Sequence, residues 1–117
     1  DREVKKAATE GNKRAKLARD MQWYQIRKVI GSYIAAMDGV DVIAFTGGIG
    51  ENCIDLREDV LSNLSYLGIK LNKEVNDATF GKEAELTLPG CPVRAFVVPT
   101  NEELAIARDT KEIVEKL

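Results

Sequence analysis

A glycine-rich segment at residues 46–52 is the first part of the sequence suited to chemistry. It reads Thr-Gly-Gly-Ile-Gly-Glu-Asn and separates a β-rich run from an amphipathic one. Unpaired N–H groups at a helix start attract anions, and glycines let the backbone approach a phosphate without a side-chain clash. The Gly-Lys-Ser/Thr ending of a P-loop is missing, and Cys53 stands where the dinucleotide pattern needs its third glycine. Two interpretations stay open, a nucleotide or phosphate site and a tight turn that packs a strand against a helix.

The two polar residues that end this segment also have two interpretations each. Asn52 is placed to cap the helix that follows, with Asp55 favouring the positive helix end. Its amide also suits the edge of a base or a ribose. The charge of Glu51 repels a phosphate, so we expect it to orient loop amides or to contact a ribose hydroxyl.

A pair of acids near the C-terminus forms the second candidate site. Thr100 and Glu103 have the spacing of a capping box, which satisfies two helix-start donors and gives Glu103 a structural task. Glu102 has no such task. It follows a predicted strand at a helix start, where a single carboxylate can hold a magnesium ion that keeps most of its waters.

Composition narrows the classes of chemistry. The chain has 117 residues, the size of one domain, and contains no histidine, which excludes His-based zinc sites and a Ser-His-Asp triad. Its two cysteines, Cys53 and Cys91, cannot build a four-thiolate zinc site, and free thiols favour a cytoplasmic location.

No apolar run is long enough to span a membrane, and no secretory leader opens the chain. The chain starts in a helical pattern without Met, which suggests a fragment or a processed protein.

Charge is unevenly distributed. Residues 1–37 hold nine basic and four acidic residues, whereas residues 38–117 hold eight and fifteen. The basic residues are interleaved with acids, so they favour a solvated helix face over a nucleic-acid surface.

Helical and strand patterns alternate along the chain. Hydrophobic spacing predicts helices over residues 1–8, 12–37, 52–67 and 101–117, with Gly68 ending the third. Residues 40–46 and 93–98 read as strands buried on both faces, residues 85–88 as an edge strand, and residues 69–83 have little pattern. The class is therefore α/β, with a sheet so thin that it needs strands from elsewhere.

The helix predicted over residues 12–37 carries an apolar stripe typical of a core or an interface. Exposure of Trp23, Tyr24 and Tyr33 would favour a dimerisation surface, because aromatic residues are enriched at interfaces.

Three stretches resemble the acetokinase family. They are VDVIAFTGGIGEN at residues 40–52, VPTNEELAIARDT at residues 98–110 and REVKKAATEGNKRAKLARDM at residues 2–21. The resemblance spans essentially the whole chain. It implies the C-terminal portion of the C-terminal nucleotide-binding domain of an acetate kinase, so that residues 1–117 form part of one ribonuclease-H-like domain of the actin, sugar kinase and heat-shock chaperone superfamily.

The resemblance also implies a reaction and its ligands. Acetate kinases transfer the γ-phosphoryl group of ATP to acetate, giving ADP and acetyl phosphate, and they require Mg²⁺. The resemblance implies no nucleic-acid or membrane partner. We expect the full-length enzyme to be a cytoplasmic homodimer. The acid that matches Glu102 helps to hold the magnesium, and the expected nucleotide-binding residues are Gly48, Ile49, Gly50, Glu51, Asn52 and Arg2.

The family's catalytic histidine, arginines and aspartate lie upstream of the part that this chain matches. We therefore expect the isolated chain to have no kinase activity, because phosphoryl transfer needs several charged groups at once. The alternatives are a propionate or butyrate kinase fragment, a non-catalytic adenine-nucleotide-binding module and a dimerisation module.

Overall fold

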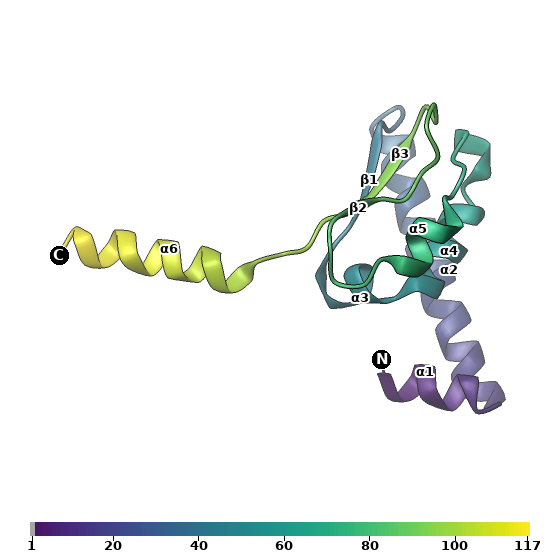
Figure 1. The fold of residues 1–117 in the computed structure, drawn as a ribbon. Coiled ribbons are helices and arrows are strands. Elements are labelled where there is room, and N and C mark those ends of the chain that lie inside the picture. The colour runs from purple at the N-terminus through teal and green to yellow at the C-terminus, as the bar shows by residue number, and fades with distance from the viewer. Residues whose placement is uncertain (1) are drawn as a thin grey trace.

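The computed structural model describes residues 2–117, except for the side chain of Arg2. Helices and strands alternate along the chain, as Figure 1 shows, which confirms the α/β class. In chain order the elements are α1 (Arg2–Thr9), α2 (Lys13–Ala36), β1 (Val42–Phe45), α3 (Gly47–Asn52), α4 (Ile54–Ser62), the 3-10 turn η1 (Ser65–Leu67), α5 (Lys73–Ala78), β2 (Ala84–Glu85), β3 (Arg94–Val97) and α6 (Glu102–Glu115).

Local signals fix both ends of the long helix α2. Gly11 has φ +90°, and Asn12 caps the helix by accepting hydrogen bonds from the N–H groups of Arg14 and Ala15. At the other end Asp38 and Gly39 have φ values of +58° and +133°. These left-handed residues end the helix and turn the chain toward β1, as the sequence predicts.

The sheet has three strands in the order β1-β3-β2. β1 and β3 are parallel, with Val42 opposite Arg94 and Phe45 opposite Val97, and the short β2 runs antiparallel to β3. The carboxyl ends of β1 and β3 therefore meet at one edge of the sheet, so the segments that follow these strands start side by side.

The two main strands are buried on one face only. Ile43 and Phe45 of β1, with Ala95 and Val97 of β3, are buried, whereas Val42 is half exposed. The expectation of burial on both faces is therefore wrong for the described residues. α2 and α4 pack against one side of the sheet, and no described segment covers the other.

The core lies between this sheet face and the helices α2 and α4. Leu56, Val60 and Leu61 of α4 contribute to it, and Trp23 of α2 is also buried. Of the three aromatic residues considered for an exposed stripe, only Tyr24 and Tyr33 are exposed.

Residues 52–83 differ from the elements predicted from the sequence in two respects. The helix expected over residues 52–67 breaks at Cys53 and ends at Ser62, before η1 and Gly68. The unpatterned residues 69–83 contain α5, whose start is capped by Asn72 accepting from the Val75 N–H. A six-residue helix leaves too short a hydrophobic pattern to be recognised.

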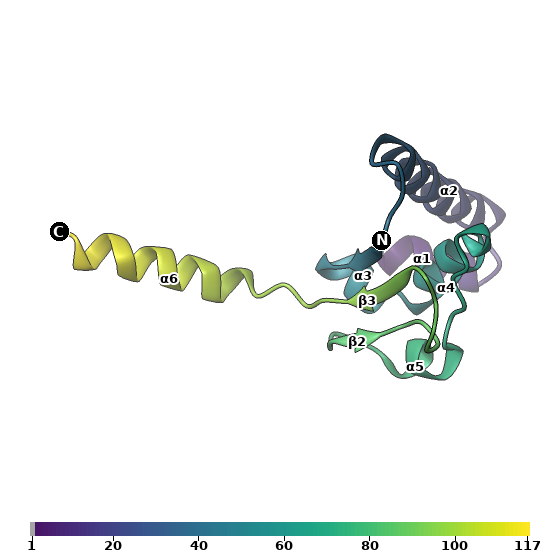
Figure 2. The same ribbon diagram turned by 90° about the horizontal axis from the view of Figure 1, so that it is seen from above.

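α6 extends away from the rest of the chain on the linker formed by residues 98–101 (Figures 1 and 2). Every residue from Asn101 to Leu117 is exposed, and the molecule measures 55 × 37 × 29 Å. Among the described helices, none is long and apolar enough to cross a bilayer.

Candidate functional site

The glycine-rich segment forms a short helix, α3, rather than an open loop. Thr46 is extended (φ −143°, ψ 170°), and Gly47 reverses the chain with φ +69°, so that α3 starts directly after β1. Gly50 is buried beneath the strand, where a Cβ would lie 3.0 Å from the carbonyl carbon of Phe45. Gly48 is exposed, and a Cβ there would meet nothing within 4 Å. The segment thus combines the two sequence interpretations: Gly50 permits close packing, and Gly48 leaves open space.

We expect Gly50→Ala to lower the free energy of unfolding, whereas Gly48→Ala leaves it unchanged or slightly raises it. The added methyl group at position 50 presses on backbone, and overpacking of this kind costs about 1–3 kcal/mol. At position 48 the methyl group meets no atom, and alanine is favoured over glycine within a helix by about 1 kcal/mol. Urea unfolding of the two variants measures the difference, and equal stabilities would contradict the packing role of Gly50.

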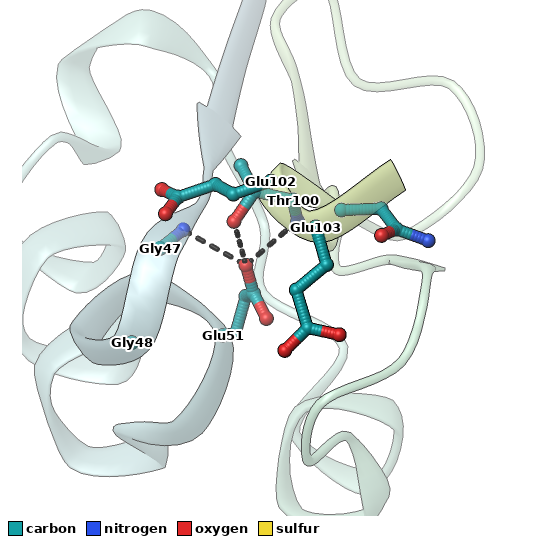
Figure 3. A pocket seen from close by; sticks show the side chains of 7 residues that line it. Gly47, Gly48, Glu51, Thr100, Glu102 and Glu103 are labelled. Carbon is teal, nitrogen blue, oxygen red and sulfur yellow. Dashed lines mark hydrogen bonds between the residues drawn. The ribbon is translucent and has the colours of Figure 1, made fainter. Parts of the chain in front are cut away.

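A single carboxylate oxygen joins α3 to the linker that precedes α6. Oε1 of Glu51 accepts hydrogen bonds from the N–H of Gly47 (2.9 Å), the N–H of Thr100 (2.9 Å) and the hydroxyl of Thr100 (3.0 Å) (Figure 3). The Thr100 N–H is the main cause that lowers the pKa of the Glu51 carboxyl, with smaller contributions from the Thr100 hydroxyl and the Gly47 N–H. Glu51 is therefore ionised at neutral pH, and these bonds weaken only when acid protonates it.

Glu51 shares a pocket of about 430 Å³ with Glu102 and Glu103. The other residues that line it are Gly47, Gly48, Thr100 and Asn101. In Figure 3 the carboxylates of Glu102 and Glu103 extend in different directions, and that of Glu102 lies on the side of Gly47. Among the described residues, three carboxylates and no basic side chain line the pocket, so a cation would favour the entry of a phosphate-bearing ligand.

The capping box expected between Thr100 and Glu103 is absent from this part of the described chain. Asn101 caps α6 instead, accepting from the Leu104 N–H at 3.0 Å, and the Thr100 hydroxyl is bonded to Glu51. Glu103 thus has no structural task that separates it from Glu102.

The donor set of this pocket fits a magnesium ion that keeps its waters. The described residues contain no cluster of three or more metal-ligating side chains, so no cage of protein ligands is present. Magnesium is typically held by one or two carboxylates together with waters and substrate phosphates. Glu102, at the first residue of α6 and exposed, offers such a carboxylate.

A buried arginine that the sequence analysis did not single out lies beneath α3. Arg57 is fully buried, and its guanidinium donates hydrogen bonds to Gly50 O (2.9 Å), Glu51 O (2.9 Å) and Thr79 O (2.6 Å). It also donates to the side-chain and backbone oxygens of Asn76, at 2.9 and 3.2 Å. Burial lowers the pKa of this guanidinium. These neutral acceptors belong to α3, α5 and the residue after α5, so Arg57 holds the three segments together.

The structure brings together only some of the residues expected to bind the nucleotide or metal. Gly48, Glu51 and Glu102 line the pocket, whereas Gly50 is buried and Ile49 lies outside the lining. Asn52 is not an N-cap: Cys53 precedes α4, and the Asn52 amide donates to Gly48 O at 3.0 Å. The expected role of Arg2 depends on a side chain outside the described residues.

Both the sequence and the fold of this chain are similar to those of known proteins. The family model described as the acetokinase family matches residues 1–108. An acetate kinase of Thermotoga maritima is 53% identical over 117 residues, which cover 99% of this chain and 29% of that protein. The crystal structure of Porphyromonas gingivalis acetate kinase superposes with a TM-score of 0.86 at 46% identity, covering 97% of this chain and 28% of that one. A propionate kinase from Francisella tularensis gives a TM-score of 0.77 at 34% identity, covering 91% and 27%.

Proposed function

The chain belongs to the acetokinase family, and from that membership we propose that it is the C-terminal, nucleotide-binding portion of an acetate kinase. Its fold is that of the acetate kinases, which belong to the ribonuclease-H-like superfamily of actin, sugar kinases and heat-shock chaperones. It spans about three tenths of the length of the curated relatives that it matches. The proposed parent enzyme transfers the γ-phosphoryl group of ATP to acetate and forms ADP and acetyl phosphate.

One observation carries the assignment of the site. Residues 47–52 and 100–103 are about fifty positions apart in sequence, yet the parallel pairing of β1 and β3 brings them to the same sheet edge. There the oxygen of Glu51 lies 2.9 Å from the backbone nitrogen of Thr100. Ligands of α/β folds bind at such edges, beyond the carboxyl ends of the strands.

In the proposed enzyme, the segment from Gly48 to Asn52 holds the adenosine end of ATP or ADP. The exposed backbone at Gly48 permits close approach, since no side chain occupies the space above it. Glu102 holds the magnesium ion, which supplies charge neutralisation on the phosphates. Glu51, already bonded to three donors, orients the backbone of Gly47 and Thr100.

A propionate kinase is the second candidate, because a structure bearing that name also resembles this chain. Acetate is the better supported acceptor: the P. gingivalis acetate kinase superposes more closely and shares more residues.

The parent protein is further proposed to be a cytoplasmic homodimer. Both cysteines are free thiols, which supports a reducing compartment. Exposed Val29 and Tyr33 of α2, next to Ile26 and Ile30, line an apolar recess suited to a partner subunit.

The test compares the full-length parent protein with the 117-residue chain. We expect the parent to form acetyl phosphate from ATP and acetate, and the chain alone to form none. In the parent, Gly48→Val should weaken ADP binding about tenfold or more, measured by calorimetry, because the side chain fills the open space of the pocket. Gly31→Val on α2 is the matched control, since a Cβ there also meets nothing within 4 Å. Unchanged ADP affinity in Gly48→Val would contradict the pocket assignment, and acetyl phosphate formation by the chain alone would contradict its expected inactivity.

A further inference from the structure

The position of α6 relative to α3 depends on very few bonds. At the start of the linker, the Val98 N–H donates to Phe45 O at 2.9 Å and so extends the pairing of β1 and β3 by one residue. Beyond it, within the described residues, the side-chain bonds between the linker and the body are those that Thr100 makes to Glu51 Oε1. Glu102 follows two residues later, at the first turn of α6.

The other end of this connection is firmly anchored. The backbone oxygen of Glu51 accepts from the buried guanidinium of Arg57 at 2.9 Å and from the Gly81 N–H at 3.2 Å. Its carboxylate is further fixed by the Gly47 N–H. The backbone of Glu51 is therefore fixed by hydrogen bonds, and the Oε1 atom of the same residue holds Thr100.

Charge opposes this arrangement. Glu51, Glu102 and Glu103 line the same pocket, and their carboxylates repel one another across it. The three donors around Glu51 Oε1 offset that repulsion at one of the three acids. Two of these donors belong to Thr100, and among the described side-chain hydrogen bonds they are the ones that tie the start of α6 to α3.

We propose that Glu51 is a positioning residue that holds Glu102 at the nucleotide pocket through its bonds to Thr100. This inference rests on the proposed function, in which Glu102 holds the magnesium ion. It assigns Glu51 to the placement of the metal-binding carboxylate and not to direct contact with the nucleotide. Loss of the Glu51 carboxylate should therefore weaken binding of Mg·ADP and leave binding of free ADP nearly unchanged.

The experiment is a double-mutant cycle on the full-length parent protein with Glu51→Ala and Glu102→Ala. Calorimetry measures the affinity for ADP with excess Mg²⁺ and with a chelator, and the ratio of the two affinities is the magnesium enhancement. Each single variant should lower this ratio roughly tenfold, the size of one lost charge-assisted hydrogen bond. The double variant should lower it no further, because residues that act through one another are not additive. The thermal unfolding midpoint of each variant establishes that it is folded.

A conservative variant separates positioning from simple packing. Glu51→Gln keeps an oxygen that can accept from Thr100 and Gly47, so its magnesium enhancement should lie within about threefold of wild type.

Three outcomes would overturn the inference, and they differ from one another. A wild type that binds ADP without magnesium enhancement would overturn the proposed metal role and the inference with it. An enhancement lost in Glu102→Ala but kept in Glu51→Ala would overturn only the positioning role. Equal losses of free ADP and Mg·ADP binding in Glu51→Ala would show that Glu51 contacts the nucleotide directly.

Discussion

Replacing Arg57 with methionine should lower the free energy of unfolding by several kcal/mol, because it leaves buried oxygens without their hydrogen-bond donors. The variant removes five hydrogen bonds from a fully buried position. The oxygens of Gly50 and Thr79 would lose these donors at buried positions, and each such loss costs about 1–3 kcal/mol before the structure relaxes. The oxygen of Glu51 keeps the Gly81 N–H as a donor. Methionine fills much of the same volume, so the loss of donors, rather than a cavity, should dominate.

Lysine at this position should recover only part of the stability. Its ammonium carries three donors on a single atom, whereas the guanidinium spreads its five donors over a plane that reaches α3 and α5 together. Arg94→Met is the matched control. Arg94 is exposed, and within the described residues its guanidinium bonds Glu85 across the sheet and lies over the Phe96 ring, so its loss should cost about 1 kcal/mol. Urea unfolding monitored through the buried Trp23 measures all three variants. A change at Arg57 no larger than that at Arg94 would show that other contacts hold α3 in place.

Sequence reasoning missed Arg57 because most of its partners are backbone oxygens. Hydrophobic spacing reports only which residues are apolar, such as Leu56 and Val60, which lie on the buried face of α4. It gives no information about a carbonyl group from α3 or α5 that needs a donor. The acceptors of Arg57 extend from Gly50 to Thr79, and only the folded chain brings them together.

The error at Thr100 has the same physical origin. A capping box between Thr100 and Glu103 is a local arrangement, and the sequence supports it. In the fold, a carboxylate 49 positions earlier takes both donors of Thr100, and Asn101 caps the helix in its place. Both donors of Thr100 therefore go to a carboxylate from a distant part of the chain, and this tertiary contact replaces the local motif.

Burial of the strands could be predicted only in part. The runs at residues 40–46 and 93–98 gave the positions of β1 and β3, because β-branched and aromatic residues cluster there. An apolar run does not show whether another segment of the chain covers the second face of the sheet. Val42 and Ala44 are apolar yet exposed in the described structure.

In the proposed full-length kinase, Glu102→Gln should lower kcat/KM for Mg·ATP about 100-fold or more, the usual effect of removing one preorganised electrostatic group from an active site. The amide keeps the size of the side chain but loses the charge that attracts the cation. The other two acids of the pocket are less suited to this role, because Oε1 of Glu51 already accepts from three donors and the Glu103 carboxylate extends in a different direction (Figure 3). Raising Mg²⁺ should recover part of the rate, since the loss is one of cation affinity.

The comparison between Glu102→Gln and Glu103→Gln decides which acid holds the metal. Because Asn101 is the helix cap, capping no longer separates the two residues, and the assignment depends on where their carboxylates lie. We expect Glu103→Gln to change kcat/KM at least tenfold less than Glu102→Gln, since its carboxylate lies away from the side of Gly47. Glu112→Gln, at an exposed position on the same helix, controls for the loss of one negative charge from α6. If Glu103→Gln has the larger effect, the magnesium ion lies on the other side of the Glu51 carboxylate, and the metal role passes to Glu103.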